Sequence, residues 1–283
     1  MNLLETIDKN RMVTFKNELL SSPFRKQPEL TLSTAQTKLI LFLVSLIDMD
    51  DKEFNEVKIS YRQFCEHFGF SYDGGKSKKL IRHQLVSLSG KNVYLKNEDG
   101  TVETLYHWLA PIHIYPKEYK IGFKLADELR PYYLELKNNF TQYQLGYVTE
   151  FRNKYSFLLY DTLKRWSTYN KGEFFYPIET AKADLSMGKY EDMRDFTRHV
   201  LKPAVEEINN KSDLHVVYRF AKAGRKITTI CFTIRTKSEK ALNEIKATWD
   251  TEKEAYSEEK EAFAENLAQL VLDGFDDYEE VEI

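Results

Sequence analysis

The order of the expected secondary-structure elements constrains this chain most, because the same order occurs in both halves of its 283 residues. In each half, apolar residues at helical spacing indicate a long helix, a short helix and a third, basic helix, followed by a β-hairpin. In the first half we expect helices at 32–47, 61–68 and 76–88, a hairpin at 93–96 and 102–108, and further strands at 112–115 and 119–123. In the second half we expect helices at 151–166, 178–185 and 190–209 and a hairpin at 214–220 and 227–234.

Three helices followed by a two-stranded wing form the winged version of the helix-turn-helix plan, in which one helix enters the major groove of DNA. The two halves share negligible sequence identity, so only the architecture repeats. We therefore expect an α+β protein with two tandem winged-helix domains and an acidic C-terminal extension. The expected boundaries are an N-terminal extension at 1–30, winged helix 1 at 31–145, winged helix 2 at 146–237 and an acidic tail at 238–283.

Charge is unevenly distributed along the chain, although the net charge is only −3. Residues 238–283 contain 15 acidic and four basic residues, which gives a net charge of −11. Residues 1–237 contain 37 Lys and Arg against 29 Asp and Glu, which gives a net charge of +8. A basic body beside an acidic tail suggests a nucleic-acid partner for the body.

The third helix of the second half presents a polar, basic face opposite its core residues Met193, Phe196 and Val200. Arginine can pair with guanine through two hydrogen bonds, and threonine can contact a base edge or a thymine methyl. The tight turn of the following hairpin carries three cations suited to phosphates. The candidate DNA contacts are Arg194, Thr197, Arg198, His199 and Lys202 on the helix and Lys222, Arg225 and Lys226 on the wing.

The third helix of the first half is similarly basic, and Ile81, Leu85 and Leu88 form its expected core row. Residues on the other side should point away from this row, with Ser77 near its edge. In both domains the alternative is a solvated helix face without a DNA partner. The candidate contacts in this helix are Lys76, Ser77, Lys78 and Arg82, with Lys79 and His83 beside them.

The sequence does not contain the residue patterns of a DNA nickase, a phosphate-binding loop or a zinc site. A rolling-circle nickase needs two histidines flanking a hydrophobic residue, but His113 and Ile114 are followed by Tyr115. The segment from Gly69 to Ser77 lacks the spacing of a phosphate-binding loop. The six His and two Cys show no zinc-site spacing. We expect a protein that is not an enzyme and that has no cofactor and no metal.

The second half contains several short segments, among them KYSFLLYD at 154–161, DFTRHVLKPA at 195–204 and GRK at 224–226. Together these segments resemble plasmid replication initiators of the iteron-binding Rep type. Asn153 stands where that family's opening pattern has Ser, and Thr197, Arg198 and His199 stand where some members are richer in Arg. The resemblance covers about residues 30–237 and is looser in the first half. The segments that carry it are KYSFLLYD at 154–161, DFTRHVLKPA at 195–204, EIN at 207–209, SDL at 212–214, GRK at 224–226 and ICFTI at 230–234.

This resemblance implies two winged helices that bind successive major grooves of double-stranded DNA at direct repeats in a plasmid origin. It also implies a monomer that opens a nearby A·T-rich segment and helps to load the host helicase with the host replication initiator. A dimer, formed through the first domain, would repress the protein's own gene. The alternative that the sequence leaves open is a winged-helix transcription repressor without a role in replication.

The N-terminus and the tail complete the expectations from sequence. The N-terminus lacks a signal peptide, and the longest apolar stretch, 39–47, is far shorter than the ~20 residues of a membrane span. We therefore expect a cytoplasmic protein that does not contact membranes. The acidic tail fits a solvated extension, a docking segment for host replication proteins or an anionic competitor for the basic face.

Overall fold

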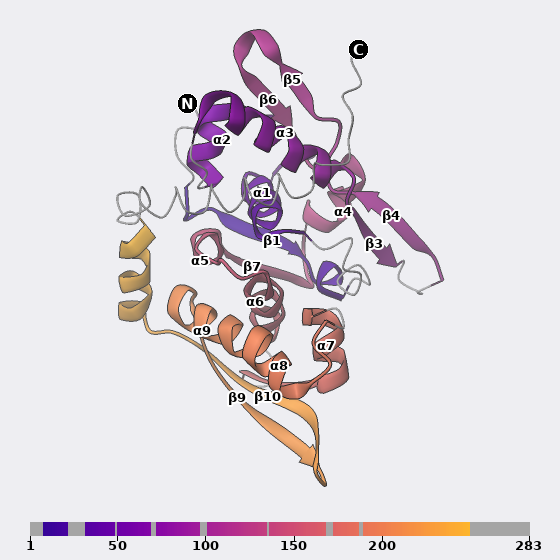
Figure 1. Cartoon of the computed structure of the whole chain (residues 1–283), viewed down its shortest axis with the longest axis vertical. Helices are drawn as coiled ribbons and strands as arrows, with labels where there is room; N and C mark the ends of the chain where they lie inside the picture. The colour runs from indigo at the N-terminus through magenta and orange to yellow at the C-terminus, as the bar shows by residue number, and fades with distance from the viewer. Residues whose placement is uncertain are drawn as a thin grey trace.

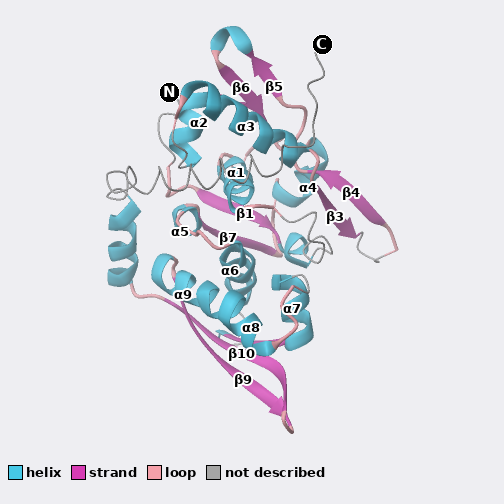
Figure 2. Ribbon diagram, viewed as in Figure 1, coloured by secondary structure: helices cyan, strands magenta, loops and turns pink. Residues whose placement is uncertain are grey.

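The computed structural model describes residues 8–21, 32–48, 50–68, 72–96, 101–134, 136–167, 172–186 and 189–249. Its two halves lie one above the other along the longest axis of the molecule (Figure 1). Each half combines a helical group with a small sheet whose hairpin projects beyond the helices (Figure 2). The buried apolar side chains of both halves join in one hydrophobic core. The elements have the order expected of two α+β units, with additions that the sequence pattern did not indicate.

Helix α1 (Thr34–Ser45) begins where its capping residues predict. The Ser33 hydroxyl accepts a hydrogen bond from the Gln36 amide, and the Gln36 side chain accepts one from the Ser33 amide. This reciprocal capping box satisfies two amides that the first helical turn leaves unpaired. The helix buries Leu39, Phe42 and Leu43 at helical spacing. The elements that follow it in the first domain are β2 (Val57–Ser60), α2 (Tyr61–Phe68), α3 (Gly74–Ser89), β3 (Asn92–Lys96), β4 (Glu103–His107), β5 (His113–Tyr115), η4 (Pro116–Glu118), β6 (Lys120–Phe123), η5 (Asp127–Leu129), α4 (Arg130–Tyr133) and β7 (Phe140–Gln144).

The wing of the first domain is β5–β6 and not the hairpin β3–β4. Strands β3 and β4 pair only with each other among the described residues, whereas β6 lies between β2 and β5 in a three-stranded sheet. The order β2-β6-β5 corresponds to β8-β10-β9 in the second domain, where the hairpin strands are β9 and β10. The bounds of these three strands are β8 (Glu173–Pro177), β9 (Leu214–Ala223) and β10 (Lys226–Thr236). The prediction of the hairpin at 93–108 is confirmed, but its assignment as the wing is wrong. A turn sequence between two β-rich segments predicts that the two strands pair, but it does not predict which sheet they join.

The N-terminal segment belongs to the first domain and is not a simple extension. Strand β1 (Met12–Lys16) pairs antiparallel with β7, with Met12 opposite Gln144 and Lys16 opposite Phe140. The 3-10 helix η1 (Asn17–Ser21) follows, and the Thr141 hydroxyl donates a 2.6 Å hydrogen bond to the Asn17 side chain. The expected boundary at residue 30 is therefore wrong, because β1 has its partner more than 120 residues further along the chain.

The second domain repeats the plan and adds a strand that the sequence analysis did not identify. Strand β8 forms the third strand of the wing sheet, where Phe174 lies opposite Phe232. The Phe174 ring stacks at 5.1 Å on Trp166, which places the end of α6 against this sheet. The elements from β7 onward are α5 (Gly146–Thr149), α6 (Lys154–Trp166), β8 (Glu173–Pro177), α7 (Ile178–Ser186), α8 (Met193–Phe196), the π-helical segment η7 (Thr197–Leu201), α9 (Lys202–Lys211), β9 (Leu214–Ala223) and β10 (Lys226–Thr236).

The helix expected at 190–209 is continuous from 193 to 211 and widens in the middle. Pro203 is the second residue of α9 and lacks the amide hydrogen that would bond one turn back. The preceding five residues, Thr197–Leu201, have π-helical geometry, and the Lys202 amide bonds to the Thr197 carbonyl. A proline inside a helix usually kinks or ends it. Here the structure accommodates the missing bond by a wide turn, which carries Arg198 and His199 of the basic face.

Polar side chains from motif segments hold α6 against the junction of α9 and β9. The buried Asp213 accepts a 2.7 Å hydrogen bond from the Tyr160 hydroxyl and forms an ion pair with Lys164. The Asn209 side chain bonds to both the amide and the carbonyl of Val216. The Glu207 carboxylate accepts hydrogen bonds from the amides of Arg152 and Asn153 at the start of α6. These residues fix α9 relative to α6 and β9 in the second domain.

Residues 239–249 form a helix that returns to the junction of the two domains, at the left of Figure 1. Its last residue, Trp249, is 5% exposed and belongs to the common core. The part of the expected tail that the structure describes is therefore docked and not simply solvated. Residues 250–283 lie outside the described residues. Among the described residues, no helix is long and apolar enough to cross a membrane.

Candidate nucleic-acid interface

The second domain presents its basic residues at the start of a well-capped helix. The Asp192 carboxylate accepts hydrogen bonds from the amides of Arg194 and Asp195, at 2.7 and 3.3 Å, and these bonds lower its pKa. Phe196 and Val200 are fully buried on the inner side. The amphipathic spacing therefore holds the outer side toward solvent. Four predicted contacts are exposed on it, namely Arg194, Arg198, His199 and Lys202.

Thr197 and His199 are both held by neighbours within the second domain. The half-buried Thr197 donates its hydroxyl hydrogen to the Met193 carbonyl at 2.7 Å, one turn back. The hydroxyl oxygen and the methyl group remain as its means of contacting a base. The His199 ring stacks on Tyr190 with centroids 5.3 Å apart. Burial, and then Tyr190, raise the pKa of Tyr155 at the start of α6. The histidine is thus oriented at the edge of the basic face.

The wing of the second domain ends in exposed cations. Gly224 has a φ of 61°, in the left-handed region that a tight hairpin turn requires. Lys226 lies 3.9 Å from Glu179 on α7, an exposed and therefore weak pair. Lys222, Arg225 and Lys226 are all exposed around this turn, as the sequence indicated. These cations lie at the end of a hairpin that projects beyond the helices (Figure 1).

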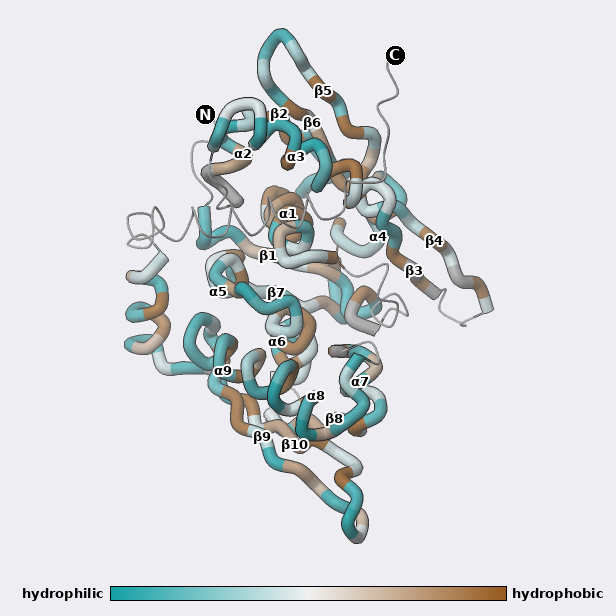
Figure 3. The backbone as a smooth tube through the Cα atoms, viewed as in Figure 1, coloured by the Kyte–Doolittle hydropathy of each residue, from teal (hydrophilic) through white to brown (hydrophobic). Residues whose placement is uncertain are grey.

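Helix α3 carries the basic face of the first domain. Lys76, Lys79 and Arg82 are exposed, whereas Lys78 is half-buried beside the buried row of Ile81, Leu85 and Leu88. Lys76 also lies 3.6 Å from the carboxylate of Asp73 in an exposed pair. The helix from 74 to 89 contains no acidic residue. Figure 3 shows α3 and α8 mostly in hydrophilic colours, in contrast to the apolar α1.

Ser77 was expected to point away from the core, and that prediction is wrong. Its side chain is buried, with 4% exposure, and its hydroxyl accepts a 2.6 Å hydrogen bond from the Asp73 amide. The residue lies at the edge of the core row, where helical spacing alone does not decide which side it takes. Ser77 therefore stabilises the start of α3 and is not available to DNA in this conformation.

The first wing supplies residues that the sequence analysis missed. Its tip is the 3-10 turn η4, which leaves Lys117 exposed and Tyr119 69% exposed at a φ of 52°. The Lys78 ammonium lies 5.8 Å from the ring of Tyr61 and 6.0 Å from that of Tyr119, near the limit for a cation–π contact. Helix α3 and the tip of β5–β6 therefore lie together. In the second domain the wing tip instead contacts α7, through Lys226 and Glu179. Recognising 113–123 as the wing would have identified Lys117 and Tyr119.

A row of lysines connects the two domains, and sequence reasoning missed it as well. Burial lowers the pKa of Lys91, which follows α3, and the neighbouring charge of Lys154 lowers it further. Burial likewise lowers the pKa of Lys154 at the start of α6, with a further contribution from Lys189. Positive charges that lower one another's pKa in this way create a positive potential, which attracts an anion. Spacing along the sequence could not reveal this row, because its members are 35 to 63 residues apart.

The comparisons with known proteins identify the family. Residues 12–164 match the family described as "Initiator Replication protein, WH1", and residues 180–234 match "Initiator Rep protein, WH2". The chain belongs to this family of initiator replication proteins. The first match begins at β1, in agreement with the pairing of β1 and β7.

Two curated relatives of this initiator come from Escherichia coli. A "Replication initiation protein" is 26% identical over 234 residues, which cover 80% of this chain and 70% of the relative. The "PI protein" is 25% identical over 237 residues, covering 75% of this chain and 70% of the relative. A solved structure described as "Crystal structure of Pi initiator protein in complex with iteron DNA" matches with a TM-score of 0.63 and 20% identity. That match covers 82% of this chain and all of the other. Together with the two family matches, it confirms the expected α+β fold of two tandem winged helices.

Proposed function

We propose that this initiator starts replication at a plasmid origin by binding direct repeats in duplex DNA through both winged helices. The observation that carries this proposal is the repeated site: the strand orders are β2-β6-β5 and β8-β10-β9, and each domain also has a helix with an exposed basic face and a wing with exposed cations. A helix of this kind fits the major groove, and a wing fits the adjacent backbone. The structural relative described with iteron DNA supports the same partner.

The proposed contacts divide into base-reading and phosphate-binding groups. Arg194, Thr197, Arg198 and His199 read bases in one groove, with Lys202 at the helix edge. Lys76, Lys78, Lys79 and Arg82 of α3 enter the next groove. The wing cations, Lys222, Arg225 and Lys226 in one domain and Lys117 in the other, bind phosphates. The row of Lys91, Lys154 and Lys189 binds the backbone that runs between the two grooves.

The later steps of initiation follow from this binding mode. A monomer on each repeat opens an adjacent A·T-rich segment and helps the host replication initiator to load the helicase. A dimer formed through the first domain represses the protein's own gene. The hairpin β3–β4 supports that dimer, because no other described strand pairs with it and because Val102 and Leu105 are 53% and 47% exposed. Unpaired strand edges and exposed apolar residues favour association with a second chain.

A DNase footprint on the DNA that flanks the coding sequence tests the proposal. We expect several evenly spaced protections, each spanning about two helical turns, as two adjacent major-groove readers require. Protection of a single inverted repeat would favour a transcription repressor. If no protection appeared even at low salt, where phosphate contacts are strongest, the basic helices would be solvated faces and the proposal would be wrong. Sedimentation of Leu105→Lys, compared with Val217→Lys on the second domain, tests the dimer surface.

A further inference from the structure

Trp249, the last described residue, inserts its side chain at the junction of the two domains. The indole lies directly against Gly146: a Cβ at that position would be 2.5 Å from the ring. The edge of the indole meets Tyr147, with centroids 5.2 Å apart. Gly146 and Tyr147 begin the short segment that leads from β7 of the first domain to α6 of the second. The C-terminal helix therefore packs on the connection that sets the relative orientation of the domains.

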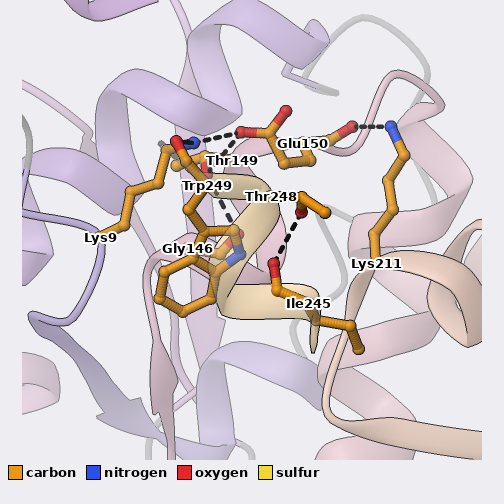
Figure 4. A network of polar contacts seen from close by, with 8 residues as sticks. All are labelled: Lys9, Gly146, Thr149, Glu150, Lys211, Ile245, Thr248 and Trp249. Atoms are coloured by element: carbon orange, nitrogen blue, oxygen red, sulfur yellow. Dashed lines mark hydrogen bonds and ion pairs between the residues drawn. The ribbon is translucent and has the colours of Figure 1, made fainter. Parts of the chain in front are cut away.

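Polar contacts bring three other parts of the chain to the same place (Figure 4). The Lys9 ammonium donates a 2.8 Å hydrogen bond to the Trp249 carbonyl and a 2.7 Å hydrogen bond to the Glu150 carboxylate. The side chains of Lys9 and Glu150, which form an ion pair, are both mostly buried. The Lys211 ammonium, at the end of α9, donates 2.8 Å to the Glu150 carbonyl. The Gly146 amide donates 2.8 Å to the Lys9 carbonyl. The N-terminal segment, the interdomain connection, α9 and the C-terminal helix are thus tied together around one indole.

The contact of Trp249 with the interdomain connection buries a large ring but leaves one polar group of that ring without a partner among the described residues. A buried tryptophan contributes a large apolar surface, but its N–H normally finds a hydrogen-bond partner. The Trp249 Nε1 is buried and has no hydrogen-bond partner among the described residues. Leaving a donor unsatisfied costs part of what the ring contributes. Directly after Trp249, residues 250–283 contain 13 acidic and two basic residues, so a basic partner could act on this end of the chain.

We infer that residues 239–249 form a latch that fixes the angle between the two winged helices, with Trp249 as its removable wedge. While the latch is closed, α3 and α8 are held at one spacing. When it opens, the interdomain connection loses one packing partner and the spacing between the two basic helices becomes more variable. Local segments with few anchoring contacts open at a lower free energy than the whole protein, which makes such a latch a regulatory element.

Distance measurement between paired spin labels tests the latch without DNA, so its outcome does not depend on the proposed function. The labels go on Val86→Cys in α3 and Val217→Cys in β9, which are exposed, whereas the native Cys65 and Cys231 are buried. We expect a narrow distance distribution in the otherwise native full-length chain and a clearly broader one with Trp249→Ala. Gly146→Ala should broaden it equally, because the added methyl displaces the indole.

Two comparisons separate a latch from a general loss of structure. The double variant Gly146→Ala with Trp249→Ala should be no broader than either single variant, because both remove the same contact. Thr248→Ala is the matched control, since that hydroxyl bonds within its own helix to the Ile245 carbonyl and should leave the distribution narrow. Amide exchange at Gly146 should accelerate by about tenfold or more in the latch variants. A distribution unchanged by Trp249→Ala would overturn the inference.

The effect on DNA is a second measurement, and it rests on the proposed function. We expect Trp249→Ala to weaken binding to a full repeat by about tenfold, because two independent domains must be ordered on binding. Binding to a half-repeat that contacts only the second domain should be unchanged. If neither DNA bound any variant while the label distances behaved as expected, the latch would stand and the proposed function would fail. Equal loss on both DNAs would contradict the latch.

Discussion

The Tyr160 hydroxyl donates a 2.7 Å hydrogen bond to the carboxylate of Asp213, and both side chains are buried between α6 and β9. Burial first, and then the charge of Asp213, raises the pKa of Tyr160 well above its ordinary value. We expect Tyr160→Phe to lower the free energy of unfolding by about 1–3 kcal/mol, because Asp213 loses a partner in a dry site. Urea denaturation measures this. Tyr115→Phe, whose hydroxyl contacts the more exposed Glu56, should have little effect.

Lys38 makes stability depend on pH at the domain junction. Its pKa is lowered to about 8, first by burial, although Glu150 opposes the shift. Below pH 8 the residue is protonated in both the folded and the unfolded states, so the folded state bears the full cost of a buried charge. Between pH 8 and 10.5 only the unfolded chain holds the proton, and stability rises with pH. We expect the unfolding free energy of the wild type to rise by about 1–3 kcal/mol relative to that of Lys38→Met between pH 8 and 10.5. A difference independent of pH would contradict the shift.

Arg198 and Lys222 should differ in how they contribute to DNA binding. Arg198→Ala should cost about 1–3 kcal/mol on the specific repeat and relax specificity, because a base contact is lost. Lys222→Ala should weaken binding to all sequences alike and reduce the salt slope by about one, because a phosphate contact is lost. Titrations on specific and random DNA at several salt concentrations check both. Arg235→Ala, an exposed arginine on β10 away from the wing tip, is the control. Equal loss on both DNAs for Arg198→Ala would reduce that residue to a phosphate contact.

Lys117 tests which hairpin is the wing of the first domain. If β5–β6 is the wing, Lys117→Ala should weaken binding to specific and random DNA alike and reduce the salt slope by about one. Thr104→Ala, at an exposed position of β4, should leave binding unchanged. The opposite result would return the role to β3–β4.

Removing residues 250–283 tests the acidic tail as an anionic competitor. The cut must follow Trp249, because a cut at 238 would also remove the latch. We expect stronger DNA binding at low salt and a difference that shrinks as salt screens the charges. The same affinity at every salt concentration would leave the tail as a solvated extension or as a docking segment for host proteins.

The sequence predicted the helices well because their apolar spacing, caps and breakers are local. It predicted the exposed Arg198 and Lys222 for the same reason, since one helix face and one tight turn are defined within a few residues. It placed Ser77 wrongly, because a residue at the edge of an apolar row is buried or exposed by its tertiary neighbours. The first wing, β8, the pairing of β1 with β7 and the row of Lys91, Lys154 and Lys189 depend on contacts between distant segments. The motif segments themselves are largely structural: Glu207, Asn209 and Asp213 bond within the protein.

The meeting of Lys9 with Trp249 sets the order in which the protein can be completed during synthesis. Strand β1 leaves the ribosome early but has no partner until residues 140–144 follow. Lys9 can bond to Trp249 only after the whole second domain has been synthesised, because Trp249 lies 240 positions later in the chain. A nascent or prematurely terminated chain can thus possess both winged helices and still lack their closure. During translation, both winged helices are therefore made before the residue that completes the contact at their junction.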